Sequence, residues 1–526
     1  MTMGFFGLTG PALARARIVL IVVPAFLLFG FNQSNIGGVL QYPSFIKYFP
    51  GLDTANTEGS TKSTNAKVQG TVVAIYTIGC LIGALGVTQV GNRIGRRKSL
   101  ILVSIVATVG LLIQATSFSL GQLVFGRILS GIGNGGVNAI VPVWQSECTK
   151  PRSRGKNVVI IGIFIATGIA AAGWTNYGLS HLSHSEVAWR LPLCLPIIFT
   201  LILIFATWWF PESPRWLISR GRDEEARAAM VTLAGPKNAN HEGITQEIRA
   251  ISNALQEAST SERGFSDLFK HNRQRLFYRL CLAVGINFAA QMTGANAISY
   301  YGTTIFQASL GLPEQRASLL NAGVLTWKIF AAVSAYLTVD RFGRRPLFVI
   351  SGLGMGVSMA SLAVSVWVLQ DHYTYAASVA ATFFLFFYMT FFPLGFLGAN
   401  FLYSTEIAPQ DLRMHLSAIG TATHWLFNFV IAEITPVAFV TIKYRYYIVY
   451  AVIAFSVSML IFFFFPETKG FSLEEMDNLF REPEHWWQVT KYSQALRKCG
   501  VLELEVGEKV EMVHHIEQPE KSAVNE

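Results

Sequence analysis

Long apolar stretches alternate along most of this chain with short polar loops, and each stretch is close to the length that crosses a lipid bilayer. A transmembrane helix needs about 20 predominantly apolar residues. Lipid offers the backbone no hydrogen-bond partners, so we interpret these stretches as helices. Six lie in the first half, at about 18–40, 70–90, 99–119, 121–143, 157–180 and 187–210. Six more lie in the second half, at about 277–307, 318–339, 347–369, 376–402, 416–440 and 446–465.

The two halves of the chain repeat each other. Three ordered pairs of motifs mark the repeat: GNRIGRRKS at 91–99 with VDRFGRRPL at 339–347, Glu147 and Arg154 with Glu406 and Arg413, and PESPR from 211 with PETKG from 466. The members of each pair are separated by roughly 250 residues, which is typical of a transporter built from two parallel halves. We therefore expect an all-α membrane protein whose twelve transmembrane helices form two six-helix bundles.

Polar segments and basic loops predict the domains and their orientation. The expected domains are a cytoplasmic N-terminus at 1–17, an N-terminal bundle at 18–210, a cytoplasmic helical linker at 211–275, a C-terminal bundle at 276–465 and a cytoplasmic tail at 466–526. Lys and Arg gather before the first helix and between helices two and three, four and five, and eight and nine. Short cytoplasmic loops carry an excess of Lys and Arg, so both termini are expected in the cytoplasm.

Composition supports a membrane protein and argues against other functions. Of the 526 residues, 52% are hydrophobic and 14% charged, whereas soluble proteins carry about 25% charged residues. The loop asymmetry accounts for the net charge of +9, so nucleic-acid binding is not inferred. The five Cys residues show no metal-site or disulfide spacing. The phosphate-binding motif GxxxxGK[ST] is absent, so we expect neither a cofactor nor transport driven by ATP.

Several motifs together resemble those of one transporter family. They are PESPRWL at 211–217, PETKGFSLEEM at 466–476, GRILSGIGNGG at 126–136 and the paired GRR loops. Over about 18–480 the chain resembles the sugar porter family of the major facilitator superfamily, particularly its fungal members. The resemblance implies two bundles around a cavity that opens alternately to each side of the membrane. It implies a transporter of a sugar or polyol, not an enzyme, working as a uniporter or with protons in the plasma membrane, in contact with membrane lipids.

Charged residues recur at the expected cytoplasmic ends of the helices in both halves. An Arg guanidinium binds a carboxylate bidentately, so these residues predict a cytoplasmic latch that holds the ends of each bundle together when the cavity faces outward. Its expected members are Arg93, Arg97, Glu147, Arg154, Glu212, Arg215, Asp340, Arg341, Arg345, Glu406, Arg413 and Glu467. Asn92 stands where many family members have Asp, which predicts a weaker latch in the first half. The alternative is that the basic residues only set the topology and contact lipid headgroups.

Polar side chains within apolar helices mark the expected substrate path. In the seventh helix, Asn287 and Gln291 are four residues apart, as are Asn296 and Tyr300, and Gly294 between the pairs is expected to break or bend the helix. Amides offer both donors and acceptors, which suits neutral polyhydroxyl ligands. By resemblance, Gln291 and Asn296 bind the sugar. The alternative is that these side chains only join helices by hydrogen bonds.

The eleventh helix carries a second group of expected ligands. Trp425 is expected to lie against the apolar face of a sugar, and Asn428 to bind its hydroxyl groups. An interfacial tryptophan is the alternative, but Trp425 lies well inside the span. His424 stands where similar transporters often have an amide.

Two departures from the family concern energy coupling and the substrate site. Asn32 of the first helix replaces the Asp that proton-coupled members typically carry, and an amide cannot take up and release a proton near neutral pH. Arg127 of the fourth helix is retained. The expected mode is therefore facilitated diffusion. The fifth helix has Ile161 and Gly162 in place of the usual Gln ligands, so the site is expected to differ from that of common hexose transporters.

A lysine in the eighth helix is the third departure. Lys328 lies twelve residues before Asp340, about 18 Å from the cytoplasmic end, where the family usually has Asn. A charged side chain inside the membrane is costly and marks function by default. One interpretation pairs Lys328 with Glu433 of the eleventh helix, which favours a neutral substrate. In the other, Lys328 faces the cavity and binds the carboxylate of a sugar acid, or exchanges a proton itself.

Two other functions of proteins with this fold are less favoured. A sugar sensor of the same fold usually has a long cytoplasmic tail, and this tail has only about sixty residues. A drug exporter of the same superfamily would lack PESPR, PETKG and the seventh-helix amides.

Overall fold

The computed structural model describes residues 7–148, 154–235, 241–260, 265–270, 274–372, 374–409, 412–471 and 473–498, and every regular element within these ranges is a helix. Eleven helical stretches in this part of the chain are long and apolar enough to cross a membrane. A further long helix, α6 (Leu120–Glu147), has 28 residues and carries Arg127 in its interior. These helices coincide with the twelve expected spans.

The first half contains α1 (Gly10–Arg17), η2 (Ile18–Val22), α2 (Val23–Val39), α4 (Gly59–Ile94), α5 (Arg96–Ala115), α6, α7 (Arg154–Ser180), α8 (Val187–Cys194) and α9 (Ile197–Thr207). Two short helices, α3 (Pro43–Tyr48) and η3 (Pro50–Leu52), lie in the loop that precedes α4. The stretch from α8 to α9 is long and apolar enough to form a single span.

The second half contains α13 (Leu276–Met292), α14 (Ala295–Thr304), η6 (Ile305–Ser309), α15 (Glu314–Phe342), α16 (Arg344–Asp371), α17 (Tyr375–Phe396), α18 (Ala399–Glu406), α19 (Arg413–Thr441) and α20 (Arg445–Phe464). The predicted break in the seventh span is confirmed, because α13 ends before Gly294 and α14 begins after it. Gly294 has a φ of 96°, a backbone conformation that favours glycine.

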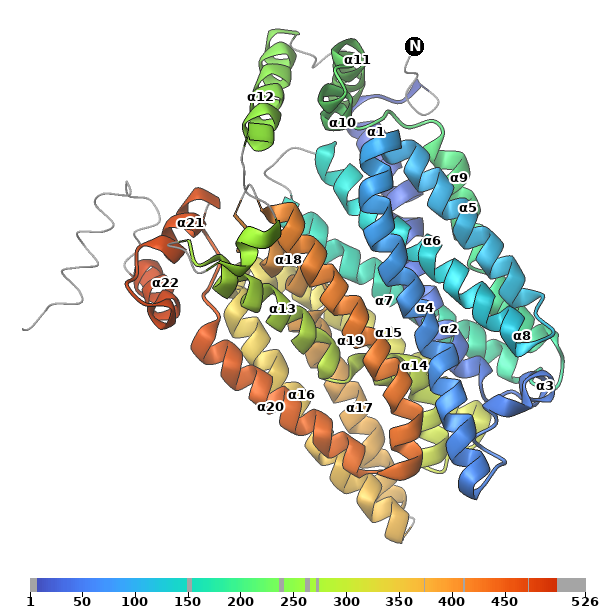
Figure 1. The fold of residues 1–526 in the computed structure, drawn as a ribbon. Helices are drawn as coiled ribbons and strands as arrows, with labels where there is room; N and C mark the ends of the chain where they lie inside the picture. The colour runs from blue at the N-terminus through green and yellow to red at the C-terminus, as the bar shows by residue number, and fades with distance from the viewer. Residues whose placement is uncertain are drawn as a thin grey trace, which may run out of the picture.

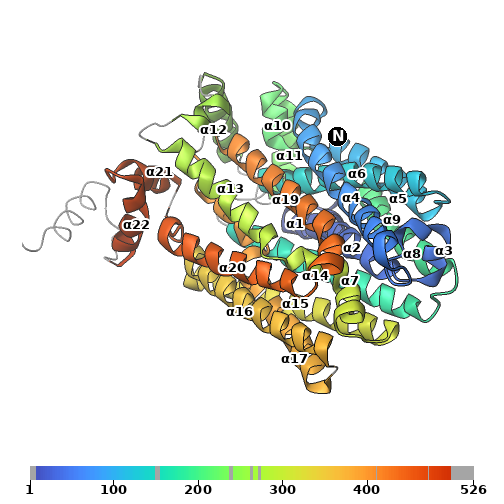
Figure 2. The same ribbon diagram turned by 60° about the horizontal axis from the view of Figure 1, so that its bottom comes forward.

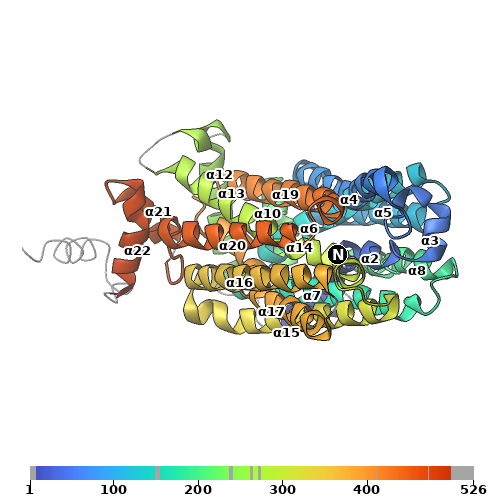
Figure 3. The same cartoon turned by 90° about the horizontal axis from the view of Figure 1, so that it is seen from below.

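Shorter helices gather at one end of the long ones. Between the halves lie α10 (Pro214–Ser219), α11 (Asp223–Ala234), α12 (His241–Thr260) and η5 (Phe265–Phe269), and α21 (Leu473–Arg481), η7 (Trp486–Gln488) and α22 (Val489–Lys498) follow the last span. Figure 1 shows α10–α12, α21 and α22 away from α3, and Figure 3 shows α12, α21 and α22 at the end opposite to α3. We call the two ends of the molecule the α12 end and the α3 end.

Each half has an apolar core of its own. One large buried cluster consists only of residues from Leu268 onward, and a second consists of first-half residues joined by Leu325 and Trp425. A third cluster, near α3, mixes residues of both halves, such as Ile36 and Tyr301. The two halves therefore meet along an interface in which α2 lies beside α14, as Figure 2 also shows.

Candidate substrate site and ion-pair clusters

A chain of hydrogen bonds between polar side chains crosses the interface between the halves. Gln33 of α2 donates from Nε2 to Oδ1 of Asn296 at 2.8 Å, and Asn296 Nδ2 donates to Gln291 Oε1. Gln291 Nε2 in turn lies 2.9 Å from the ring nitrogens of His424 on α19. The three amide side chains are all buried. We call this set, Gln33, Asn296, Gln291 and His424, the amide network.

Other amides near this network have unused hydrogen-bonding groups. Tyr300 donates from its hydroxyl to Asn428 Oδ1 at 2.9 Å, but Nδ2 of Asn428 has no partner. Nδ2 of Asn32 is likewise buried without a partner. A buried donor without an acceptor costs about 1–3 kcal/mol, so both amides gain from a ligand that offers hydroxyl oxygens.

Trp425 is placed at the boundary between the halves and not among lipid. Its side chain is 4% exposed, and it belongs to the core cluster of the first half. The ring stands edge-to-face against Phe29 of α2, with centroids 5.5 Å apart, and against His424, with centroids 5.7 Å apart. Such a position suits an aromatic wall of a ligand site better than a membrane-interface anchor.

Of the interpretations of Lys328, the ion pair with Glu433 is not present in the structure. Lys328 Nζ donates to Ser299 Oγ at 3.3 Å and lies 5.1 Å from the ring centroid of Phe392. Glu433 instead accepts a 2.8 Å hydrogen bond from Thr71 Oγ1 of α4. Lys328 and Glu433 contact different helices because α15, which carries Lys328, packs on α7 and α17, whereas α19, which carries Glu433, packs on α4.

Arg127, a second buried cation, contacts uncharged groups. Its Nη2 donates to the carbonyl of Val73 at 3.0 Å, and its guanidinium lies 5.2 Å from the ring centroid of Tyr76. Asn32 offers it no carboxylate.

The halves are in close contact toward the α3 end. Ser34 Oγ donates to the carbonyl of Ser299 at 3.0 Å, and Gln41 Nε2 donates to Thr304 Oγ1 at 3.0 Å. At Gly37 the backbones approach so closely that a Cβ would lie 1.8 Å from the carbonyl oxygen of Tyr300. This approach requires glycine, and it closes α2 against α14.

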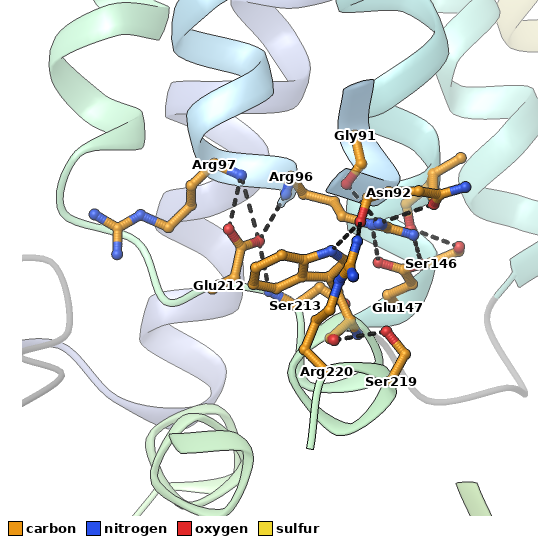
Figure 4. A network of polar contacts seen from close by, with 12 residues as sticks. Gly91, Asn92, Arg96, Arg97, Ser146, Glu147, Glu212, Ser213, Ser219 and Arg220 are labelled. Carbon is orange, nitrogen blue, oxygen red and sulfur yellow. Dashed lines mark hydrogen bonds and ion pairs between the residues drawn. The ribbon is translucent and has the colours of Figure 1, made fainter. Parts of the chain in front are cut away.

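The α12 end of the first half carries an ion-pair cluster (Figure 4). Arg96 donates from Nε and Nη2 to the two carboxylate oxygens of Glu147, both at 2.9 Å. Glu212 Oε1 accepts from the backbone N–H of Arg96 at 3.0 Å, and its Oε2 from that of Arg97 at 3.2 Å. Burial raises the pKa of the Glu212 carboxyl, while backbone N–H donors, including that of Ser213, act in the opposite direction.

The second half repeats this arrangement. Arg344 donates from Nη2 and Nε to Glu406 at 2.8 and 3.2 Å, and Glu467 accepts from the backbone N–H groups of Arg344 and Arg345 at 2.9 and 3.1 Å. Here α22 adds a contact, because Ser493 Oγ accepts from the Glu467 N–H at 3.1 Å. Each cluster lies within its own half.

A family model described as "Sugar (and other) transporter" matches residues 18–480. The chain belongs to the sugar porter family. Sugar transporter STL1 of Saccharomyces cerevisiae is 33% identical over 507 residues, covering 95% of this chain and 87% of that protein. MFS-type transporter oryC of Aspergillus oryzae is 36% identical over 482 residues, covering 91% and 87%. A solved structure of the proton:xylose symporter XylE matches with a TM-score of 0.71 and 25% identity, covering 89% of this chain and 99% of that one.

As a sugar porter of the major facilitator superfamily, the protein is a multi-pass membrane transporter and not an enzyme. The arginines of its ion-pair clusters differ from the expected ones. Arg93 and Arg341 are exposed and make no ion pair with Glu147 or Glu406. Arg97 reaches the carbonyl of Trp208 and Arg345 that of Phe462.

The remaining expected latch residues of this sugar porter are placed as follows. Arg215 is exposed and Arg413 is half-buried, whereas the side chains of Arg154 and Asp340 lie outside the described residues. Asn92 accepts a 3.3 Å hydrogen bond from Arg96. The ion pair of Arg96 with Glu147 is formed in the first half, as that of Arg344 with Glu406 is in the second.

The sequence did not lead us to predict the roles of three residues in this porter: Gln33 in the amide network, and Arg96 and Arg344 in the ion-pair clusters. Gln33 follows Asn32 directly in an apolar helix, and that polar run was the signal that could have found it. Arg96 and Arg344 each follow the glycine of a GRR loop. Gly95 and Gly343 have φ values of 95° and 96°, so each ends one helix and lets the next arginine begin another.

Proposed function

We propose that this porter moves a sugar or polyol across the plasma membrane by alternating access, and that the substrate binds at the amide network. The observation that carries the proposal is the buried hydrogen-bond chain from Gln33 through Asn296 and Gln291 to His424, because it joins helices of both halves. A ligand bound there contacts both halves, so its binding depends on how the two halves are placed relative to each other.

The chemistry of the site supports a polyhydroxylated substrate. A hydroxyl group donates one hydrogen bond and accepts others, and amides can meet both needs. Nδ2 of Asn32 and Nδ2 of Asn428 are donors without partners, and Tyr300 adds a hydroxyl beside Asn428. Trp425 offers an apolar surface for the carbon skeleton, at the same boundary between the halves. In this proposal all four side chains contact the substrate.

We propose that both termini, and with them the α12 end, face the cytoplasm, as the basic loops favour. The contacts of Ser34 and Gln41 with the second half then lie toward the outside. Each ion-pair cluster joins elements within one half, so it fixes the cytoplasmic ends of that half. The two halves can then move as rigid bodies around the substrate.

Uptake in a yeast strain that lacks its own sugar transporters tests this function. The strain expresses the protein and receives radiolabelled hexoses, pentoses, polyols and disaccharides. We expect saturable uptake of at least one of these compounds above the empty-vector level, lowered by Gln291→Ala at equal surface expression. No uptake of any of them by protein that has reached the cell surface would overturn transport of neutral sugars and polyols.

A further inference from the structure

Lys328 lies in the interior of the helical bundle, and no described residue supplies it with a counter-charge. Its side chain is 1% exposed, and within the described part of the chain its one hydrogen bond is the 3.3 Å contact with Ser299 Oγ. The Ser299 hydroxyl donates to the carbonyl of Ala295 at 3.0 Å, so its oxygen is free to accept from the ammonium. An ammonium carries three donors, which leaves two of them without a partner in the described part of the chain.

The helices around α15 bring no carboxylate to this lysine. These neighbours are α7, α14, α16, α17 and η6. Along their described middle sections, the titratable side chains are tyrosines: Tyr177, Tyr300, Tyr301 and Tyr388. The hydroxyls of the last three donate to Asn428, to the Ala432 carbonyl and to the Thr293 carbonyl.

The acidic residues of α15 and α16 lie at the helix ends. Glu314 and Asp340 are fourteen and twelve residues from Lys328, which is about 18 Å or more along α15. Asp371 is the last residue of α16. Glu433 is held by Thr71. None of these carboxylates contacts the ammonium, so Lys328 has no counter-charge among the described residues.

Lys328 is close to the amide network. Its acceptor Ser299 follows Asn296 by three residues on α14, so the two side chains lie on one face about one helical turn apart. Asn296 bonds to Gln33 and Gln291. A ligand whose hydroxyl groups occupy this network therefore places a group at one end of its carbon chain within reach of the ammonium.

We propose that Lys328 binds the carboxylate of an anionic polyhydroxylated substrate, a sugar acid, whose hydroxyl groups occupy the amide network. This inference rests on the proposed transport function and narrows its substrate class. An unpaired charge inside a membrane is costly, and a carboxylate bound to an ammonium forms the strong, charge-assisted hydrogen bonds that offset this cost. The substrate thereby supplies the counter-charge that neither Asn32 nor Glu433 provides.

The test compares acidic and neutral substrates in the transporter-deficient yeast. Uptake of labelled gluconate, glucuronate and galacturonate is measured beside that of glucose, xylose and sorbitol. The variants are Lys328→Asn, Lys328→Arg and, as a matched control, Lys67→Asn, which removes an exposed lysine of α4. We expect wild type and Lys67→Asn to take up at least one sugar acid. Lys328→Asn should lower that uptake at least tenfold at equal surface expression, and Lys328→Arg should retain part of it, since a guanidinium also binds carboxylates.

Several results would overturn the inference, and they differ from failure of transport itself. Uptake of neutral sugars without any sugar acid contradicts carboxylate binding and leaves the transport function standing. Uptake of neither class by surface-expressed protein contradicts both. Acid uptake that is equal in wild type and Lys328→Asn contradicts the role of Lys328. If wild-type uptake of neutral sugars depends on the proton gradient and that of Lys328→Asn does not, the lysine carries protons instead.

A second variant keeps the inference testable if Lys328→Asn does not reach the cell surface. In that case Ser299→Ala must raise the half-saturation constant for the sugar acid severalfold, and an unchanged constant contradicts the site.

Discussion

Gln33 donates a 2.8 Å hydrogen bond to Asn296, a residue 263 positions later in the chain. Gln33 belongs to α2 and Asn296 to α14, so the bond crosses from the first half of the transporter to the second. In alternating access the halves move around a site at their interface, and a bond in this place must break or rearrange with each cycle. In the function that we propose, the pair therefore links substrate binding to the movement of the halves.

Removing either partner of this bond should weaken substrate binding. Because a net hydrogen bond is worth about 0.5–1.5 kcal/mol, Gln33→Ala and Asn296→Ala should each raise the half-saturation constant about two- to twelvefold. Gln246→Ala, which changes an exposed glutamine of α12, serves as the control and should leave it unchanged. The measurement is the concentration dependence of uptake. Unchanged constants in both site variants would place the substrate elsewhere.

The ion-pair clusters predict a difference between neighbouring arginines. Arg96→Ala leaves the carboxylate of Glu147 without its partner. Breaking a fully buried pair in this way costs about 3–5 kcal/mol, which is the upper limit for this pair because its side chains are 12% and 9% exposed. We expect a lower unfolding temperature of the purified protein and slower transport, whereas Arg93→Ala should resemble wild type in both. The second half offers the same comparison between Arg344→Ala and Arg341→Ala.

The double variant Arg96→Ala/Glu147→Ala is the internal check of this prediction. It removes both charges and should recover part of the stability lost by Arg96→Ala. If Arg93→Ala lowers the unfolding temperature as much as Arg96→Ala, the assignment of the pair is contradicted.

The close approach at Gly37 predicts that a side chain there holds the α3 end open, which is the end that we propose faces outside. A methyl group would meet the Tyr300 carbonyl, so Gly37→Ala should slow transport strongly. It should also increase labelling of an introduced Ser34→Cys by an impermeant maleimide added outside the cell. Gly86→Ala is the matched control, because nothing lies within 4 Å of its added Cβ. Wild-type transport rates in Gly37→Ala would argue against closure at this contact.

Asn32 predicts how neutral-sugar uptake responds to the proton gradient. The amide has no proton to exchange, so uptake of a neutral substrate should stop at equal concentrations on the two sides. A protonophore should leave its initial rate unchanged. Accumulation above the external concentration that collapses with the protonophore would show coupling through another residue.

The sequence was sufficient to predict the helices and the repeat, but it did not resolve the local geometry. Runs of apolar residues determine the spans because lipid permits no other backbone arrangement. The pairing within the GRR loops depends on the left-handed turns at Gly95 and Gly343, which decide where the next arginine points. Spacing alone favoured Arg93 and Arg341, because each ends an apolar helix.

The contacts of the interior charges Lys328 and Glu433 could likewise not be derived from the sequence. Lys328 and Glu433 are both polar residues of apolar helices, and their depth along the membrane allowed a pair. Whether two such residues meet depends on which helices are neighbours, and α15 packs on α7 and α17 while α19 packs on α4. Which helices lie side by side is a property of the tertiary structure, and the periodicity of a single sequence does not predict it.

Counterflow in proteoliposomes tests most directly whether the amide network carries the substrate. Vesicles with the purified protein are loaded with an unlabelled compound that yeast uptake has identified, and the labelled compound is added outside. Wild type should show transient accumulation of label. Gln291→Ala loses a hydrogen bond worth about 0.5–1.5 kcal/mol, so it should show about two- to twelvefold less at a substrate concentration below the half-saturation constant. Absence of counterflow with every sugar, polyol and sugar acid, or equal counterflow by Gln291→Ala, would contradict transport through this site.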